Sequence, residues 1–100
     1  MYLKLIKKKV TSMSLEIIDF SATWCGPCKM QKPIIEELKA KYGDKVLFRV
    51  IDVDEDQSLA HDYSVHAIPT IVILHDGKMV NSFVGLTSKE KLETEIAKYI

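Results

Sequence analysis

Cysteine is scarce in this sequence: Cys25 and Cys28 are the only two among 100 residues. Two cysteines are too few for the disulfide framework of a small secreted protein. An excess of charge is also lacking, because 14 basic residues balance 14 acidic ones, whereas nucleic-acid-binding domains are usually basic. The basic cluster in residues 4–9 is short and typical of a solvated surface. We therefore expect no nucleic-acid partner.

Long apolar runs are missing as well. No run approaches the ~18–20 residues that a membrane-spanning helix needs, and residues 10–14 do not supply the apolar core of a signal peptide. We therefore expect no membrane association and a cytoplasmic location. A length of 100 residues predicts one domain, residues 1–100. The hydrophobic fraction of 47% and the charged fraction of 28% are typical of a globular chain and argue against disorder.

The hydrophobic pattern predicts five strands and three helices in a mixed α/β fold. Apolar and β-branched runs predict strands at residues 2–6, 15–20, 46–53, 70–74 and 79–84. The run at 46–53 is the most continuous, which favours a central strand covered on both faces. Asp76-Gly77 predicts a hairpin between the last two strands. Strands separated by helices pair in parallel, so the sheet is expected to be mixed, with one antiparallel edge and helices packed on it.

Helix signals fill the gaps between these strands. Four apolar residues recur at steps of four and mark one helix face that ends before Gly43: Met30, Ile34, Leu38 and Tyr42. The acidic residues 54–56 open a short second helix that runs to about Tyr63. Residues 87–90, Thr-Ser-Lys-Glu, fit a capping box, so a last helix is expected to begin there and to bury Leu92 and Ile96.

The chemistry concentrates at Cys25-Gly26-Pro27-Cys28, between a buried strand and a helix. Two intervening residues let both sulfurs meet at the start of the helix, where its partial positive charge stabilises a thiolate on Cys25. We expect Cys25 to be the exposed nucleophile and Cys28, one turn later, the buried resolving thiol. Gly26 allows the close approach of another backbone, and Pro27 fits the first helical turn.

Half of a zinc site is the alternative interpretation of this pair. Structural zinc takes four ligands, and the sequence has no second cysteine pair. His61, His66 and His75 could complete a site, but their spacings match no common zinc pattern. A Cys-x-x-Cys between strand and helix favours redox chemistry, so we expect no bound metal.

Two signatures give the sequence a family resemblance. Residues 19–29, Asp-Phe-Ser-Ala-Thr-Trp-Cys-Gly-Pro-Cys-Lys, resemble the active-site signature of thioredoxins, and Ile68-Pro69-Thr70 resembles their cis-proline loop. Asp76-Gly77 and Val84-Gly85 fall at the family's hairpin and glycine positions. The resemblance covers residues 14–100 and implies the thioredoxin fold, a central mixed sheet flanked by helices.

The resemblance implies a general protein-disulfide reductase. Cys25 would attack a substrate disulfide, Cys28 would resolve the mixed disulfide, and Asp19 would be a buried carboxylate that exchanges a proton with Cys28. The strand pattern alone leaves open whether Asp19 is buried or faces solvent. The partner's chain would bind an apolar surface made of Trp24, Gly26, Pro27, Ile68, Pro69, Val84 and Gly85. The family binds no cofactor and is recharged by an external thioredoxin reductase, NADPH-dependent or ferredoxin-linked. We expect a monomer.

The sequence departs from the family in two places. Only about ten residues separate the predicted strand at 2–6 from the next one, so the usual first helix is expected to be absent or reduced to a turn. Many members place a charged side chain, often Lys, beside the buried Asp, and the matching position here is Val50. Arg49 is one residue away and is expected to point to the other face. Without that charge, the pKa of Asp19 is expected to be higher.

Other functions compete with this interpretation. A glutaredoxin-like reductase would be expected to carry Tyr between the cysteines and more basic residues to hold glutathione. An oxidising relative would carry His between the cysteines, where it makes the disulfide a stronger oxidant. A non-catalytic binding subunit would use the fold and leave the thiols idle.

Overall fold

The computed structural model describes residues 14–100. The predicted strand at 2–6 and the predicted loss of the first helix lie outside these residues. The elements are, in order, β1 (Leu15–Ser21), α2 (Gly26–Tyr42), η1 (Gly43–Lys45), β2 (Leu47–Asp52), α3 (Gln57–Asp62), β3 (Thr70–His75), β4 (Lys78–Val84) and α4 (Lys89–Ala97). From residue 15 onward, every predicted strand and helix is present.

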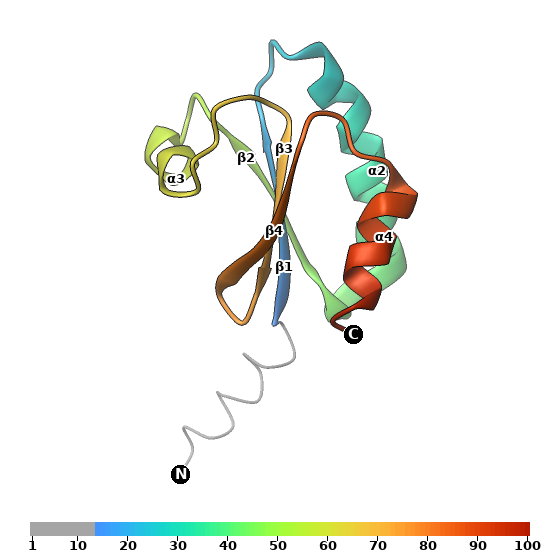
Figure 1. The fold of residues 1–100 in the computed structure, drawn as a ribbon. Helices are drawn as coiled ribbons and strands as arrows, with labels where there is room; N and C mark the ends of the chain where they lie inside the picture. Colours follow the sequence, from blue (N-terminus) through green and yellow to red (C-terminus); the bar gives the residue numbers. More distant parts are fainter. Residues whose placement is uncertain (1–13) are drawn as a thin grey trace.

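The described strands form one sheet in the order β2-β1-β3-β4. β1 and β2 are parallel, whereas β1–β3 and β3–β4 are antiparallel. Helices α2 and α4 lie on one face of this sheet and α3 lies on the other (Figure 1). The predicted mixed sheet flanked by helices is therefore confirmed.

The prediction that residues 46–53 form a central strand covered on both faces is wrong for the described sheet. Among residues 14–100, β2 lies at one end of the strand order and pairs with β1 alone, and its Leu47 and Val50 are 37% and 55% exposed. β1 and β3 occupy the centre, and nearly all their side chains are buried. An apolar run shows that a strand can be buried, but the strand order decides which one is.

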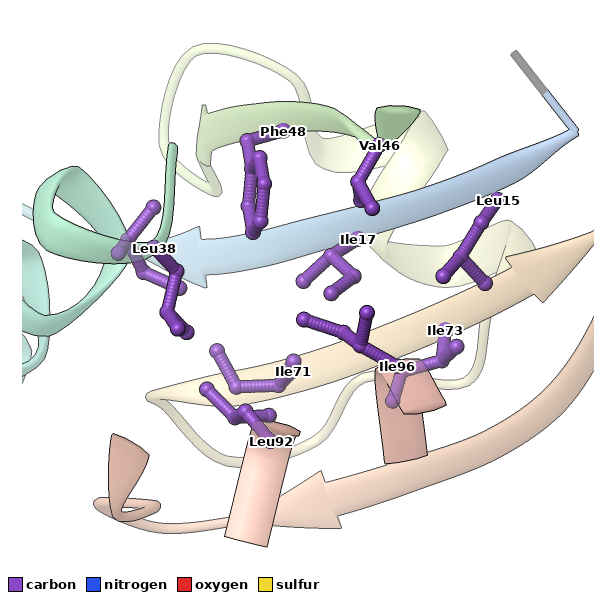
Figure 2. Close-up of a cluster of buried hydrophobic side chains, with 10 residues drawn as sticks. Leu15, Ile17, Leu38, Val46, Phe48, Ile71, Ile73, Leu92 and Ile96 are labelled. Atoms are coloured by element: carbon purple, nitrogen blue, oxygen red, sulfur yellow. The ribbon is translucent and has the colours of Figure 1, made fainter. Parts of the chain in front are cut away.

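Alternation along β1 divides the core into two clusters. Leu15 and Ile17 point to the face covered by α2 and α4, where the core includes Leu38 and Ile96 (Figure 2). The side chains at the alternate positions of β1, Ile18 and Phe20, point to the α3 face. The period of two that buries Ile17 under α2 also directs Asp19 to that face.

The buried face of α2 agrees with the predicted one in part. Leu38 is buried and Ile34 and Tyr42 pack partly buried against the core, whereas Met30 is 61% exposed. The fully buried residues of the helix are Cys28, Gln31, Ile35 and Leu38. An α-helix has 3.6 residues per turn, so a run of four-residue steps drifts around the axis, and alternating steps of three and four keep to one face. The correction places a polar residue, Gln31, in the apolar stripe.

The start of α4 also differs by one residue. Ser88 is the N-cap, and its side chain accepts a hydrogen bond from the Lys91 backbone N–H. The predicted capping box would have used Thr87 as the cap and Glu90 as its partner. Thr87 is buried just before the helix, and its backbone bonds to a side chain of α2 instead.

Candidate active site

Cys25 and Cys28 are joined by a disulfide where β1 passes into α2, with 5.3 Å between their Cα atoms. Cys25 is the N-cap residue of the helix, and its Sγ accepts a hydrogen bond of 3.2 Å from the Cys28 backbone N–H. Pro27 lies in the first turn, as expected. The sulfur of Cys25 therefore lies at the positive end of the helix dipole, beside an N–H group that can stabilise a thiolate.

The expected difference in exposure between the two cysteines is absent in this disulfide form. Cys25 is 4% exposed and Cys28 is 3% exposed, so the prediction of an exposed Cys25 is wrong here. The cause is local packing: both cysteines lie in an apolar cluster with Ala22, against which Val53 and Ile68 pack. A thiolate that attacks this disulfide must therefore come into close contact with the residues around it.

Asp19 lies on β1 and is buried, with 1% of its surface exposed. Its Oδ1 has no hydrogen-bond partner among residues 14–100. Burial without a partner disfavours the charged form and raises the pKa of Asp19 from 3.8 to about 6. Its neighbour across the parallel pair of strands is Val50, which carries no charge. The structure thus decides between the two alternatives for Asp19, since the carboxyl group is not turned to solvent.

A surface pocket of about 390 Å³ is lined by both Asp19 and the second cysteine, Cys28. Val50 and the two helix residues Lys29 and Lys32 line it as well. The buried carboxyl group and the second cysteine therefore face the same space, which reaches the surface.

The residues expected to bind a partner come from three separate segments: residues 24–27 contain Cys25, Ile68 packs against the cysteines, and Val84–Gly85 is hydrogen-bonded to the Ile68–Pro69 segment. Trp24 is 67% exposed, and its indole N–H donates a hydrogen bond of 2.8 Å to Asp54 Oδ2. Gly26 and Pro27 are exposed beside it, at the start of α2.

The second segment contains the Ile68–Pro69 peptide bond, which is cis, as the resemblance implied. Ile68 is half-buried, and Pro69 is buried beneath the surface. Val84 and Gly85 belong to the third segment, and Val84 is 72% exposed. The Gly85 backbone N–H donates a hydrogen bond of 2.8 Å to the Pro69 carbonyl oxygen, which ties the second segment to the third.

Three residues that shape this region are not among the candidate residues predicted from the sequence. Val53 packs against the cysteines, Asp54 orients Trp24, and Gln31 binds the backbone of Thr87. Gln31 could have been found from its place three residues after Cys28 and four before Ile35, which is the spacing of one helix face. Nothing in the sequence indicates the contact between Trp24 and Asp54, which are 30 residues apart.

Comparison with known proteins identifies the family. The Thioredoxin family profile matches residues 3–98. The chain belongs to the thioredoxin family. It is 46% identical over 90 residues to a thioredoxin of Bacillus subtilis, an alignment that covers 90% of this chain and 86% of that protein. It is 44% identical over 86 residues to a thioredoxin of Staphylococcus aureus, covering 86% of this chain and 83% of the other.

Solved thioredoxin structures agree with this assignment. A mutant thioredoxin of Halobacterium salinarum is 38% identical with a TM-score of 0.81, covering 94% of this chain and 81% of that one. The oxidised mitochondrial thioredoxin 3 of Saccharomyces cerevisiae is 36% identical with a TM-score of 0.79, covering 96% and 89%. The fold expected from the resemblance, a thioredoxin fold, is thus confirmed for the described residues.

Membership establishes the chemistry in general terms. The protein is a thiol-disulfide oxidoreductase that catalyses dithiol–disulfide exchange with an active-site cysteine pair, and it acts as a disulfide reductase. Thioredoxins use their own cysteines without a cofactor, and as a family they have disulfide substrates and a thioredoxin reductase as partner. Within residues 14–100, no three His, Cys, Asp or Glu side chains are grouped so that they could hold a metal ion. No helix in that part of the thioredoxin chain has the length and apolar character required to cross a membrane.

Proposed function

We propose that the protein reduces disulfides in other proteins by dividing the reaction between Cys25 and Cys28. The Cys25 thiolate attacks one sulfur of the partner's disulfide, which forms a mixed disulfide and releases the partner's other sulfur as a thiolate. The Cys28 thiolate then attacks Cys25 Sγ, which closes the Cys25–Cys28 disulfide and releases the partner's second thiolate. Two electrons pass to the partner. The hydrogen bond from the Cys28 N–H to Cys25 Sγ, at the helix N-terminus, carries this assignment.

We propose that Asp19 exchanges a proton with Cys28 during the second step. Cys28 must lose its proton before it attacks, and a carboxyl group can take that proton if its pKa lies near neutrality. Burial raises the pKa of Asp19 to about 6. Asp19 and Cys28 line the same pocket, which supports this proposal.

We propose that partner proteins bind the surface formed by Trp24, Gly26, Pro27, Ile68, Val84 and Gly85, with the buried Pro69 beneath it. Trp24, which precedes Cys25, and Val84 are exposed apolar side chains, whereas the disulfide itself is buried. A second pocket, of about 380 Å³, is lined by Trp24, Val53 and Ile68 and offers room for a partner's side chain. Exposed aromatic and aliphatic side chains around a reactive group are typical of a protein-binding surface.

Val84→Asp tests this surface. Val84 is 72% exposed, so the change costs little stability, but it places a charge where an apolar partner would bind. We expect the KM for insulin reduction to rise about tenfold, which corresponds to about 1.4 kcal/mol of binding. Reduction of a small aromatic disulfide should change less than twofold. Met79→Asp is the matched control, because Met79 is 50% exposed at the other end of β4. Equal KM values for the two variants would contradict the proposed surface.

We further propose that the chain acts as a cytoplasmic monomer of one domain, recharged by a thioredoxin reductase that takes electrons from NADPH or from ferredoxin. Insulin reduction should proceed with NADPH and a bacterial thioredoxin reductase, or with reduced ferredoxin and a ferredoxin-linked reductase. Glutathione with glutathione reductase should give only background rates. Activity with glutathione alone would contradict the proposal and favour a glutaredoxin-like reaction. One zinc ion per reduced chain, measured by metal analysis, would instead favour the structural zinc site.

A further inference from the structure

Gln31 is a buried polar side chain in the apolar stripe of α2, with 0% of its surface exposed. Both ends of its amide group are bonded to one residue. The Gln31 Nε2 donates a hydrogen bond of 3.0 Å to the Thr87 carbonyl oxygen, and the Thr87 backbone N–H donates one of 2.8 Å to Gln31 Oε1. Such a two-point contact fixes orientation as well as distance, because both partners must align.

Thr87 is linked in turn to the proposed partner surface. Its Oγ1 donates a hydrogen bond of 2.9 Å to the Gly85 carbonyl oxygen, and the Gly85 N–H donates one of 2.8 Å to the Pro69 carbonyl oxygen. A continuous chain of hydrogen bonds therefore runs from Gln31, one turn beyond Cys28, to the Val84–Gly85 segment and on to the Ile68–Pro69 segment, whose Ile68 packs against the cysteines. Figure 1 shows the connection between β4 and α4 beside α2.

The connection between β4 and α4 depends on Gln31 for backbone hydrogen bonds. Gly85 has a φ of 92°, in the left-handed region, and ends the extended course of β4. Thr87 precedes the N-cap Ser88, so its N–H group is outside the hydrogen bonds of both β4 and α4. Thr87 is 4% exposed, which leaves water little access to its backbone. An apolar residue at position 31 would leave a buried N–H and a buried carbonyl group unpaired, which is unfavourable.

We propose that Gln31 is a positioning residue for partner binding, which holds the Val84–Thr87 segment at a fixed place relative to the helix that carries the cysteines. The proposal rests on the proposed function of Val84 and Gly85 as part of the partner surface. Within residues 14–100, both hydrogen bonds of the Gln31 side chain are to Thr87. Gln31 acts through Thr87, and it keeps the apolar surface aligned with the sulfur that the partner's disulfide must reach.

Gln31→Met tests the proposal, because Met has a similar length and volume but cannot bond to both Thr87 groups. We expect the KM for insulin reduction to rise about five- to tenfold, while kcat stays within about twofold. Reduction of a small aromatic disulfide, which needs no extended surface, should be unchanged. Amide hydrogen exchange measured by NMR should become at least about tenfold faster at Thr87 and Gly85, because their segment opens more readily. Unchanged KM and unchanged exchange would overturn the proposal.

Ile35→Val is the matched control, because Ile35 is 2% exposed in the same stripe, and the change removes one methylene group but no hydrogen bond to Thr87. It should lower stability and leave the KM unchanged, and an equal rise in KM would overturn the proposal. If Gln31→Met does not fold, Thr87→Val is the second variant. It removes the hydrogen bond from Thr87 Oγ1 to the Gly85 carbonyl oxygen and is expected to raise the KM about threefold. A folded Thr87→Val variant with an unchanged KM would overturn the proposal as well.

The comparison with Val84→Asp separates this inference from the function on which it rests. If Val84→Asp leaves the KM unchanged, the partner surface itself is misplaced. If Val84→Asp raises the KM and Gln31→Met does not, the surface stands and the positioning role of Gln31 fails.

Discussion

A Cys25→Ser variant is expected to lose reduction of protein disulfides, by on the order of a thousandfold or more. Serine keeps the shape of the side chain, but its hydroxyl group is a far weaker nucleophile than a thiolate. The Cys28 thiol remains but lies one turn inside α2, away from the N-cap position. The measurement is insulin reduction coupled to NADPH oxidation by a thioredoxin reductase. A residual rate within tenfold of the parent would contradict the assignment of Cys25 as the attacking thiol.

The matched Cys28→Ser variant should fail at a different step. Cys25 can still attack, but no second thiol attacks the mixed disulfide that forms, so the partner stays covalently bound. Intact-mass spectrometry after incubation with a disulfide-containing protein should show this adduct, and dithiothreitol should remove it. Normal turnover without adducts would contradict the division of roles. Full biological activity of a variant lacking both cysteines would favour the non-catalytic binding subunit.

The sequence predicts the order of elements because local patterns determine them. The hairpin is an example: Asp76 and Gly77 both have positive φ values, 54° and 82°, as the turn requires. The helix at Gly26 starts where the Cys-Gly-Pro motif predicts. These features depend on a few adjacent residues, so the sequence alone is enough to find them.

Features that depend on distant residues are harder to predict. The apolar run at 46–53 favours the sheet centre, but β1 and β3 occupy it in the described sheet. Gln31 is easily missed because a polar residue does not fit an apolar stripe until its partner Thr87, 56 residues away, is known. The low exposure of Cys25 depends on Val53 and Ile68, which approach it only in the folded chain.

Asp19 combines a feature that can be predicted from the sequence with one that cannot. Asp19 lies near the end of the predicted strand at 15–20, where a side chain can be buried or face solvent, so the strand pattern leaves both alternatives open. The resemblance to thioredoxins predicts burial, and the structure confirms it. The absence of a cation at Val50 is visible in the sequence, but the pocket that Asp19 and Cys28 both line is not.

Asp19→Asn is expected to slow the release of the reduced partner more than the first attack. Asn cannot accept a proton, so Cys28 must lose its proton to water instead. Rapid mixing with a fluorescent disulfide substrate separates formation of the mixed disulfide from its resolution. If the Asp19→Asn variant resolved the mixed disulfide at the rate of the parent throughout the range from about pH 6 to pH 8, a proton-transfer role of Asp19 would be contradicted.

The same substitution should make the oxidised protein more stable at neutral pH. The pKa of Asp19 is raised from 3.8 to about 6, so between these values the folded state holds a proton that the unfolded state has lost. The free energy of unfolding therefore falls as the pH rises through this window. Above about pH 6, Asp19 is ionised in both the folded and the unfolded state, so the full free-energy cost of burying its charge remains. A pKa difference of about two corresponds to about 3 kcal/mol.

Asn at position 19 carries no charge to bury, so it removes this penalty. We expect Asp19→Asn to raise the free energy of unfolding by about 2–3 kcal/mol at about pH 7.5. At about pH 3.5, where the carboxyl group is protonated in the folded state and largely so in the unfolded state, the gain should nearly vanish. Urea unfolding at both pH values measures it, with Asp44→Asn as the control, because Asp44 is exposed. Equal stability of parent and variant at the higher pH would show that the folded state does not bury a charged Asp19.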